Sequence, residues 1–211
     1  MTVHLLHGFN VRDGGARTTA RWAGAFEDAG YTAVPHDLGL IGLVDLRCRN
    51  RALVDELLPL VQPGDTVVAH SNGCLIAWLL VEAGAKPSTV VCVNAALRRD
   101  TRWPDTLPVL NLHSSADDVL LFARLWRRLA VSGHGWGAAG RYGFGTASGK
   151  QVCNVDMAEK WWEYPARGHS DAFKEPAWPY WAEHTAQWVK SAGCSEAPGP
   201  TSLRCETPTH T

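Results

Sequence analysis

The chain has 211 residues, a net charge of −1, 45% hydrophobic residues and 19% charged residues. This length suits one domain with a sizeable core, and the composition excludes an intrinsically disordered protein. The near-neutral net charge gives no sign of the excess of basic residues that is typical of nucleic-acid binding, and no hydrophobic run is long enough to span a bilayer.

The six cysteines include no CxxC pair, which argues against a zinc knuckle and suits a reducing compartment. The chain starts directly with the strand-like run "TVHLLHG", without the pattern of a secretory signal. No histidines and acids stand at metal-ligand spacing. We therefore expect a cytoplasmic protein that holds no metal.

Short β-type runs alternate with helical patterns along the chain. The strand-like runs are 2–6, 32–35, 66–70, 89–93, 109–112 and 161–164. Hydrophobic residues at helical spacing occur at 22–29, 53–58, 73–83, 119–131 and 181–188. This alternation predicts an α/β fold, with a mostly parallel sheet of about six strands and helices on both faces.

Residues 1–192 form one predicted domain, and 193–211 are rich in Pro, Ser and Thr, which predicts a disordered tail. Seven glycines between 133 and 149 predict a long irregular loop at 132–150. Its "GWGAAG" matches a dinucleotide-binding fingerprint, but no strand precedes it and no helix can follow it. No cofactor is therefore expected.

Parallel sheets bind ligands at the carboxyl ends of their strands, and polar residues gather at these ends in the predicted order. The first strand is followed by "HGFN", the third by "SNG", the fifth by "SSADD" and the sixth by "GHS". A serine, an acid and a histidine therefore each follow a different strand.

These segments resemble the α/β-hydrolase fold superfamily over nearly the whole chain up to about residue 192. Ala69-His70-Ser71-Asn72-Gly73 is similar to the nucleophile elbow G-x-S-x-G, with alanine in place of the first glycine. "LPVLNLHSSADDVL" resembles the acid segment, "GHSDAF" the histidine loop and "HGF" the loop after an early strand. The resemblance implies a minimal member without a separate lid domain.

The resemblance implies a serine hydrolase, most plausibly a carboxylesterase for small or medium acyl esters. Ser71 would be the nucleophile, His169 the general base and Asp117 the acid that orients the imidazole. The backbone N–H groups of Phe9 and Asn72 would stabilise the oxyanion. A catalytically silent binding protein is the alternative, and amidase, thioesterase or acyltransferase chemistry would use the same triad.

Several residues have competing interpretations. Ser71 could only cap a helix. Asp118 competes with Asp117, although it is better placed to cap the following helix. His70 is adjacent to Ser71 and cannot fold back onto it, so a structural role is expected, as for His7.

The Gly-rich loop is also a candidate part of the site. We expect it to overlook the strand ends as a mobile cover, with Trp136 and Phe144 binding the substrate. A loop that only bridges two elements is the alternative.

Overall fold

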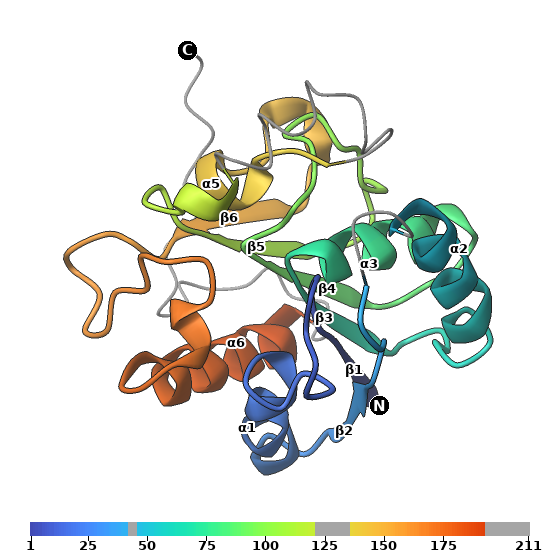
Figure 1. Cartoon of the computed structure of the whole chain (residues 1–211), viewed down its shortest axis with the longest axis horizontal. Helices are drawn as coiled ribbons and strands as arrows, with labels where there is room; N and C mark the ends of the chain where they lie inside the picture. The colour runs from blue at the N-terminus through green and yellow to red at the C-terminus, as the bar shows by residue number, and fades with distance from the viewer. Residues whose placement is uncertain (42–45, 121–135, 193–211) are drawn as a thin grey trace.

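The structure, a computed structural model, describes residues 1–41, 46–120 and 136–192 (Figure 1). All six strands are parallel and form one sheet in the order β2-β1-β3-β4-β5-β6. The strands are β1 Thr2–Leu6, β2 Thr32–His36, β3 Thr66–His70, β4 Thr89–Val93, β5 Val109–His113 and β6 Val152–Asp156. The predicted α/β class and parallel sheet are confirmed.

Helices cover both faces of this sheet (Figure 1). The α-helices are α1 Ala23–Asp28, α2 Leu46–Leu57, α3 Asn72–Glu82, α5 Ala139–Tyr142 and α6 Ala177–Ala192. The 3-10 helices are η1 Thr19–Trp22, η2 Thr146–Ser148 and η3 Asp171–Phe173. The backbone is also helical at residues 118–120, and the rest of the helix expected at 119–131 lies outside the described residues.

The buried residues form two clusters separated by the sheet. Along β3, Val67 and Ala69 belong to the cluster with α2 and α3, whereas Val68 belongs to the cluster with α1 and α6. Successive side chains of a strand point to opposite faces, so an apolar run such as "TVVAH" supplies both clusters at once. The central strands are buried along their whole length for this reason.

The first five strands lie where the sequence predicts them, but the sixth does not. Residues 161–164 form turns and bends, and β6 is Val152–Asp156 instead. The aromatic run packs as a connection: Trp162 contacts the ring of Trp181, and its Nε1 donates a hydrogen bond to the carbonyl oxygen of Asp156 at 2.7 Å. The predicted tail at 193–211 lies outside the described residues.

The described part of the Gly-rich segment, residues 136–150, contains regular structure where the sequence predicts an irregular loop. Residues 136–150 contain α5 and η2, and Gly140 donates a hydrogen bond to the carbonyl of Ala95 at 2.8 Å. A Cβ atom on Gly140 would lie 2.2 Å from the nitrogen of Ala95, and one on Gly137 would lie 2.5 Å from the Cα of Arg98. Here glycine permits close backbone packing rather than mobility.

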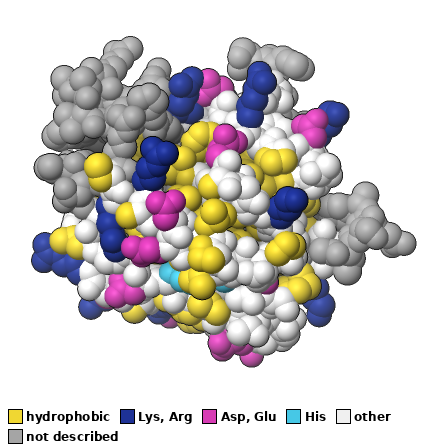
Figure 2. Space-filling model, turned by 90° about the vertical axis from the view of Figure 1, so that its right-hand side faces the viewer, with side chains coloured by type: hydrophobic (Ala, Val, Ile, Leu, Met, Phe, Trp, Pro, Cys, Tyr) yellow, Lys and Arg dark blue, Asp and Glu magenta, His cyan; other side chains and the backbone are white. Residues whose placement is uncertain are grey.

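The surface charges, the helices and the cysteines of the described residues relate to the predictions about nucleic acid, membranes, metals and the cellular compartment. On the face in Figure 2, Lys and Arg side chains alternate with Asp and Glu among hydrophobic ones. No helix within the described ranges could cross a membrane, and no cluster of potential metal ligands occurs there. Cys48, Cys74 and Cys92 are free thiols, whereas Cys153 is disulfide-bonded, which a reducing compartment does not favour.

Gly140→Ala should destabilise the fold by about 1–3 kcal/mol or more, because the added methyl group meets backbone that cannot move aside. Gly24→Ala in α1 is the matched control: nothing lies within 4 Å of its Cβ position. It should stabilise the protein by about 0.5–1 kcal/mol. Urea denaturation measures both free energies of unfolding, and similar values for the two variants would contradict this packing argument.

Candidate active site

Ser71 occupies a strained turn between β3 and α3. Its backbone has φ 53° and ψ −118°, a conformation that residues with a side chain rarely adopt. Three backbone hydrogen bonds hold it there: Ser71 N–H donates to Val93, and the Ser71 carbonyl accepts from Cys74 and Ala96. The turn presents the hydroxyl at the carboxyl edge of the sheet. No hydrogen bond from the side chain caps α3.

The glycines around Ser71 let three segments meet. A Cβ on Gly73 would lie 2.6 Å from the carbonyl oxygen of His7, and a Cβ on Gly8 would lie 2.8 Å from the Cβ of Ser71. The loop after β1 therefore passes directly against the turn. Ala69 in β3, where the G-x-S-x-G pattern has glycine, is fully buried and fits.

His169 and Asp117 complete a hydrogen-bonded chain with Ser71. The Nε2 atom of His169 lies 2.8 Å from Ser71 Oγ, and its Nδ1 lies 2.7 Å from Asp117 Oδ2. An ionised carboxylate only accepts hydrogen bonds, so Nδ1 carries the proton and Nε2 is free to accept one from the hydroxyl. Three residues that follow three different strands are thus brought together.

Asp117 is fully buried and firmly held. Its Oδ2 accepts a hydrogen bond from Asn94 Nδ2 at 2.7 Å, and its Oδ1 accepts from the backbone N–H groups of Val119 and Leu120 at 3.0 and 3.3 Å. Burial raises the pKa of Asp117, but the hydrogen bonds and charge of His169 and the other donors outweigh it and lower the pKa below its usual value. The carboxylate stays ionised.

The two N–H groups expected to form an oxyanion hole lie beside this chain of hydrogen bonds. Asn72 is the first residue of α3, directly after Ser71, and Phe9 follows Gly8, which packs on Ser71. Among the hydrogen bonds between described residues outside helices and strands, none uses the backbone N–H of Phe9 or Asn72.

His70 is held as a neutral ring against His169. It is almost fully buried, and burial, followed by the nearby His169, lowers the pKa of His70 to about 3. Its Nε2 donates to the backbone carbonyl of His169 at 3.0 Å, and its ring contacts those of His169 and Phe173. The Ser71 hydroxyl has His169 as its hydrogen-bond partner, not His70.

The competing acid has a different role from the one expected. Asp118 is mostly exposed and pairs with Arg141 at 2.8 Å, and its carboxylate accepts no hydrogen bond from a helix N–H group within the described residues. Asp117 Oδ1 accepts from the N–H groups of the helical turn instead. His7 supports the loop as expected, because its Nδ1 donates to Gly8 and its Nε2 accepts from Leu38 N–H.

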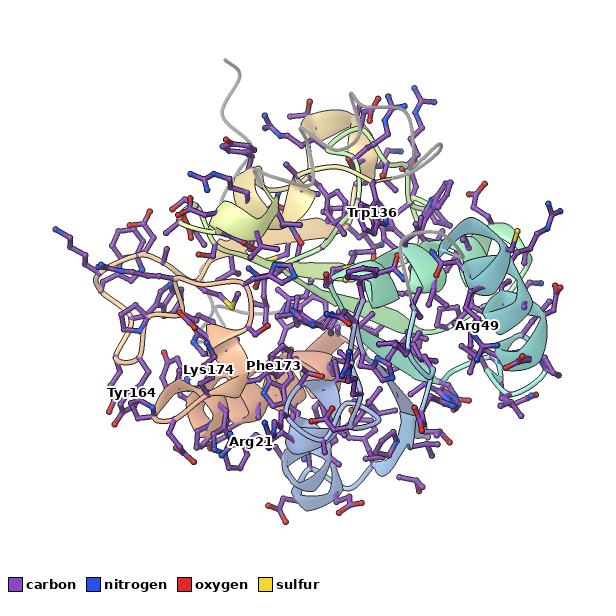
Figure 3. The ribbon with its side chains drawn as sticks, in the orientation of Figure 1. Arg21, Arg49, Trp136, Tyr164, Phe173 and Lys174 are labelled. Carbon is purple, nitrogen blue, oxygen red and sulfur yellow. The ribbon has the colours of Figure 1, made fainter. Side chains whose placement is uncertain are left out.

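The two aromatic residues proposed for the substrate lie in different surroundings. Trp136 donates from Nε1 to Asn72 Oδ1 at 3.0 Å and contacts the ring of Phe9, so it borders the site (Figure 3). Phe144 is buried and packs edge-to-face on Trp103, with its backbone bonded to Asn154. Within the described part of the chain, Phe144 makes no hydrogen bond or ring contact with the other site residues.

Sequence reasoning missed Asn94 and Asn50. Asn94 follows β4 at the same edge of the sheet, so the rule that collected the other residues could have found it. Its positive φ of 46° is tolerated by asparagine. Asn50 lies within α2 and bonds to Asn72, and no local pattern marks it.

Solved structures share this architecture. A proposed YdeN-like hydrolase from Pectobacterium atrosepticum is 17% identical over 91% of both chains, with a TM-score of 0.52. TT1662 from Thermus thermophilus is 13% identical over 92% of this chain and 90% of its own, with a TM-score of 0.56. Lipase B of Aspergillus fumigatus is 11% identical over 95% of this chain and 54% of its own, with a TM-score of 0.58.

The chain has the α/β-hydrolase fold. Comparisons with family models and with curated proteins gave no match, so the likeness concerns architecture alone. The α/β-hydrolase fold explains why Ser71, Asp117 and His169 can meet: parallel strands bring the loops after β3, β5 and β6 to one edge of the sheet.

The neutral, buried His70 should make stability depend on pH. An unfolded chain protonates this histidine near pH 6.5, whereas the folded protein does so only near pH 3. The contribution of His70 to the free energy of unfolding is therefore complete above pH 6.5 and is lost as the pH falls below that value. Between about pH 6.5 and 5 the free energy of unfolding should fall by about 2 kcal/mol more than in His70→Gln.

Urea denaturation at these two pH values measures the difference. His36, whose pKa burial and then His4 lower to about 4, is present in both proteins and cancels. Equal losses in the wild type and His70→Gln would show that His70 takes up a proton in the folded protein.

Proposed function

We propose that the protein is a serine hydrolase, a carboxylesterase for small or medium acyl esters. The observation that carries this proposal is the continuous chain from Ser71 Oγ through His169 to Asp117, with distances of 2.8 and 2.7 Å. The strained turn that presents the serine supports the same function, because such strain concentrates at reactive sites.

Ser71 and His169 would carry out the chemistry. As Ser71 Oγ attacks the ester carbonyl carbon, its proton moves to His169 Nε2 and the carbonyl oxygen becomes an oxyanion. The oxyanion collapses, the bond to the alcohol breaks, and His169 returns the proton to the leaving alkoxide. Water then attacks the acyl-enzyme, giving its proton to His169, which passes it to Ser71 as the carboxylic acid leaves.

The remaining groups would stabilise charge during these steps. Asp117 holds the proton on His169 Nδ1 and offsets the positive charge that forms on the ring. The N–H groups of Phe9 and Asn72 would donate to the oxyanion, and losing one such donor costs about 3 kcal/mol in comparable sites. None of these steps requires a cofactor.

The substrate class rests on the apolar side chains near Ser71. Phe9 is half-buried and is backed edge-to-face by the buried ring of Trp136, with ring centroids 6.1 Å apart, so the Phe9 ring offers an apolar surface to an acyl group. A silent binding protein, the alternative, requires a broken triad, and the observed distances give it no support. Amide and thioester substrates belong in the same assay panel, because the triad serves all three.

The cytoplasmic location stays a prediction from cysteine usage. The free, buried thiols of Cys74 and Cys92 agree with that compartment, whereas the disulfide at Cys153 is typical of oxidising compartments.

Ser71→Ala should abolish labelling by a fluorophosphonate probe and lower kcat for p-nitrophenyl esters by several orders of magnitude. The fold should remain, because alanine changes only the hydroxyl. Labelling intensity and ester hydrolysis measure the effect, with circular dichroism as the check on folding. Labelling that persists in Ser71→Ala would assign the nucleophile to another residue, and an unlabelled wild type would favour a binding protein.

Asp117→Asn should lower kcat by about 10⁴-fold, because an amide no longer holds His169 in the required tautomer. Asp118→Asn is the matched control: its exposed ion pair contributes at most about 1 kcal/mol, and its activity should stay near that of the wild type. Steady-state kinetics decides between them. A larger loss in Asp118→Asn would mean that the acid is misassigned.

A further inference from the structure

The side chain of Asn72 is held by a buried cluster of three residues. Its Oδ1 accepts hydrogen bonds from Asn50 Nδ2 at 3.1 Å and from Trp136 Nε1 at 3.0 Å. Its Nδ2 donates to Asn50 Oδ1 at 2.9 Å. Asn72, Asn50 and Trp136 are 0%, 3% and 8% exposed, so water cannot easily replace these partners.

Trp136 also reaches the other half of the proposed oxyanion hole. Its ring meets that of Phe9 edge-to-face at 6.1 Å, while its Nε1–H is bonded to Asn72. One side chain from the segment after residue 135 therefore contacts both residues whose N–H groups would face the oxyanion. Close packing of Gly137 against Arg98 anchors the backbone next to Trp136.

We propose that Asn50 and Trp136 are positioning residues for the oxyanion hole, an inference that rests on the proposed function. The reciprocal amide pair and the indole N–H fix the Asn72 side chain, since any rotation would leave buried polar groups unpaired. Asn72 begins α3 directly after Ser71, so a fixed side chain restrains the direction of its backbone N–H. Stabilisation of an oxyanion requires hydrogen-bond donors that are already oriented before the oxyanion forms.

This role differs from that of a substrate cover. A cover binds the acyl group, so its loss raises KM for bulky esters. A positioning residue leaves ester binding nearly unchanged and lowers kcat for every ester, because the oxyanion forms in all of them. The two roles therefore separate in steady-state kinetics.

Trp136→Phe and Asn50→Ala test the proposal. Trp136→Phe keeps an aromatic ring beside Phe9 and removes only the hydrogen bond to Asn72. Each variant should lower kcat about 10-fold, less than the roughly 10²- to 10³-fold loss of a whole donor. The decrease should be the same for p-nitrophenyl acetate and butyrate. Affinity for a trifluoromethyl ketone, which forms an oxyanion with serine, should fall in parallel while KM stays nearly constant.

Asn111→Ala is the matched control. Asn111 and Asn154 form another buried amide pair on β5 and β6, with Asn111 Nδ2 donating to Asn154 Oδ1 at 2.9 Å and to the carbonyl of Ala139 at 3.2 Å. No hydrogen bond between described residues joins this pair to Asn72. This variant should lower the melting temperature but leave kcat at 25 °C within about twofold. If Asn50→Ala does not fold, Trp136→Phe decides the question alone.

Two results would overturn the proposal while leaving the proposed function intact. One is unchanged kcat and ketone affinity in both variants, with only a lower melting temperature. The other is a KM increase confined to the butyrate ester, which would make Trp136 a substrate contact. Failure of the wild type to react with a fluorophosphonate would instead overturn the proposed function, and this inference with it.

Discussion

The turn at Ser71 sets how the start of α3 and the loop after β1 meet in the site. A non-glycine residue at φ 53° is unfavourable unless its surroundings hold it, and here hydrogen bonds to Val93, Cys74 and Ala96 do so. Because the turn is sharp, α3 starts in contact with the end of β1, where only glycine fits at position 73. The loop that carries Phe9 is thereby pressed against the serine, and both proposed oxyanion donors come from this one constraint.

The sequence predicts most of the sheet because parallel central strands are apolar on both faces. Runs such as "TVVAH" and "TVVCV" carry that signal without help from the rest of the fold. β6 does not, since Asn154 interrupts it. That residue is stabilised by the backbone of Phe144 and the side chain of Asn111. The local sequence pattern around Asn154 does not reveal these partners, because they lie far away in the sequence. The aromatic run at 161–164 therefore matches a strand pattern better than β6 does.

In the candidate site, too, some residues can be predicted from the local sequence pattern and others depend on partners far away in the sequence. Ser71 and Asp117 could be named from the sequence because each closely follows a correctly predicted strand and the strand ends share one edge. The sequence assigns His169 to the strand expected at 161–164, which is a connecting segment, and its loop instead follows β6. Asn50 could not be named from the sequence, because its partner lies 22 residues away on another helix. The glycines at 137 and 140 misled for a related reason: in sequence they suggest mobility, and only the neighbouring backbone shows close packing.

The sheet separates the two kinds of chemistry that the proposed reaction needs. His70 and Phe173 support the base from the side of α1 and α6, whereas Asn50 and Trp136 support the proposed oxyanion donors from the side of α2 and α3. Figure 3 shows Phe173 and Trp136 on these opposite sides. Ser71 lies at the boundary, since it directly follows β3, a strand whose side chains alternate between the faces. The proposed proton transfer and oxyanion stabilisation would therefore depend on different packing clusters, and a change in one cluster could alter one step while leaving the other intact.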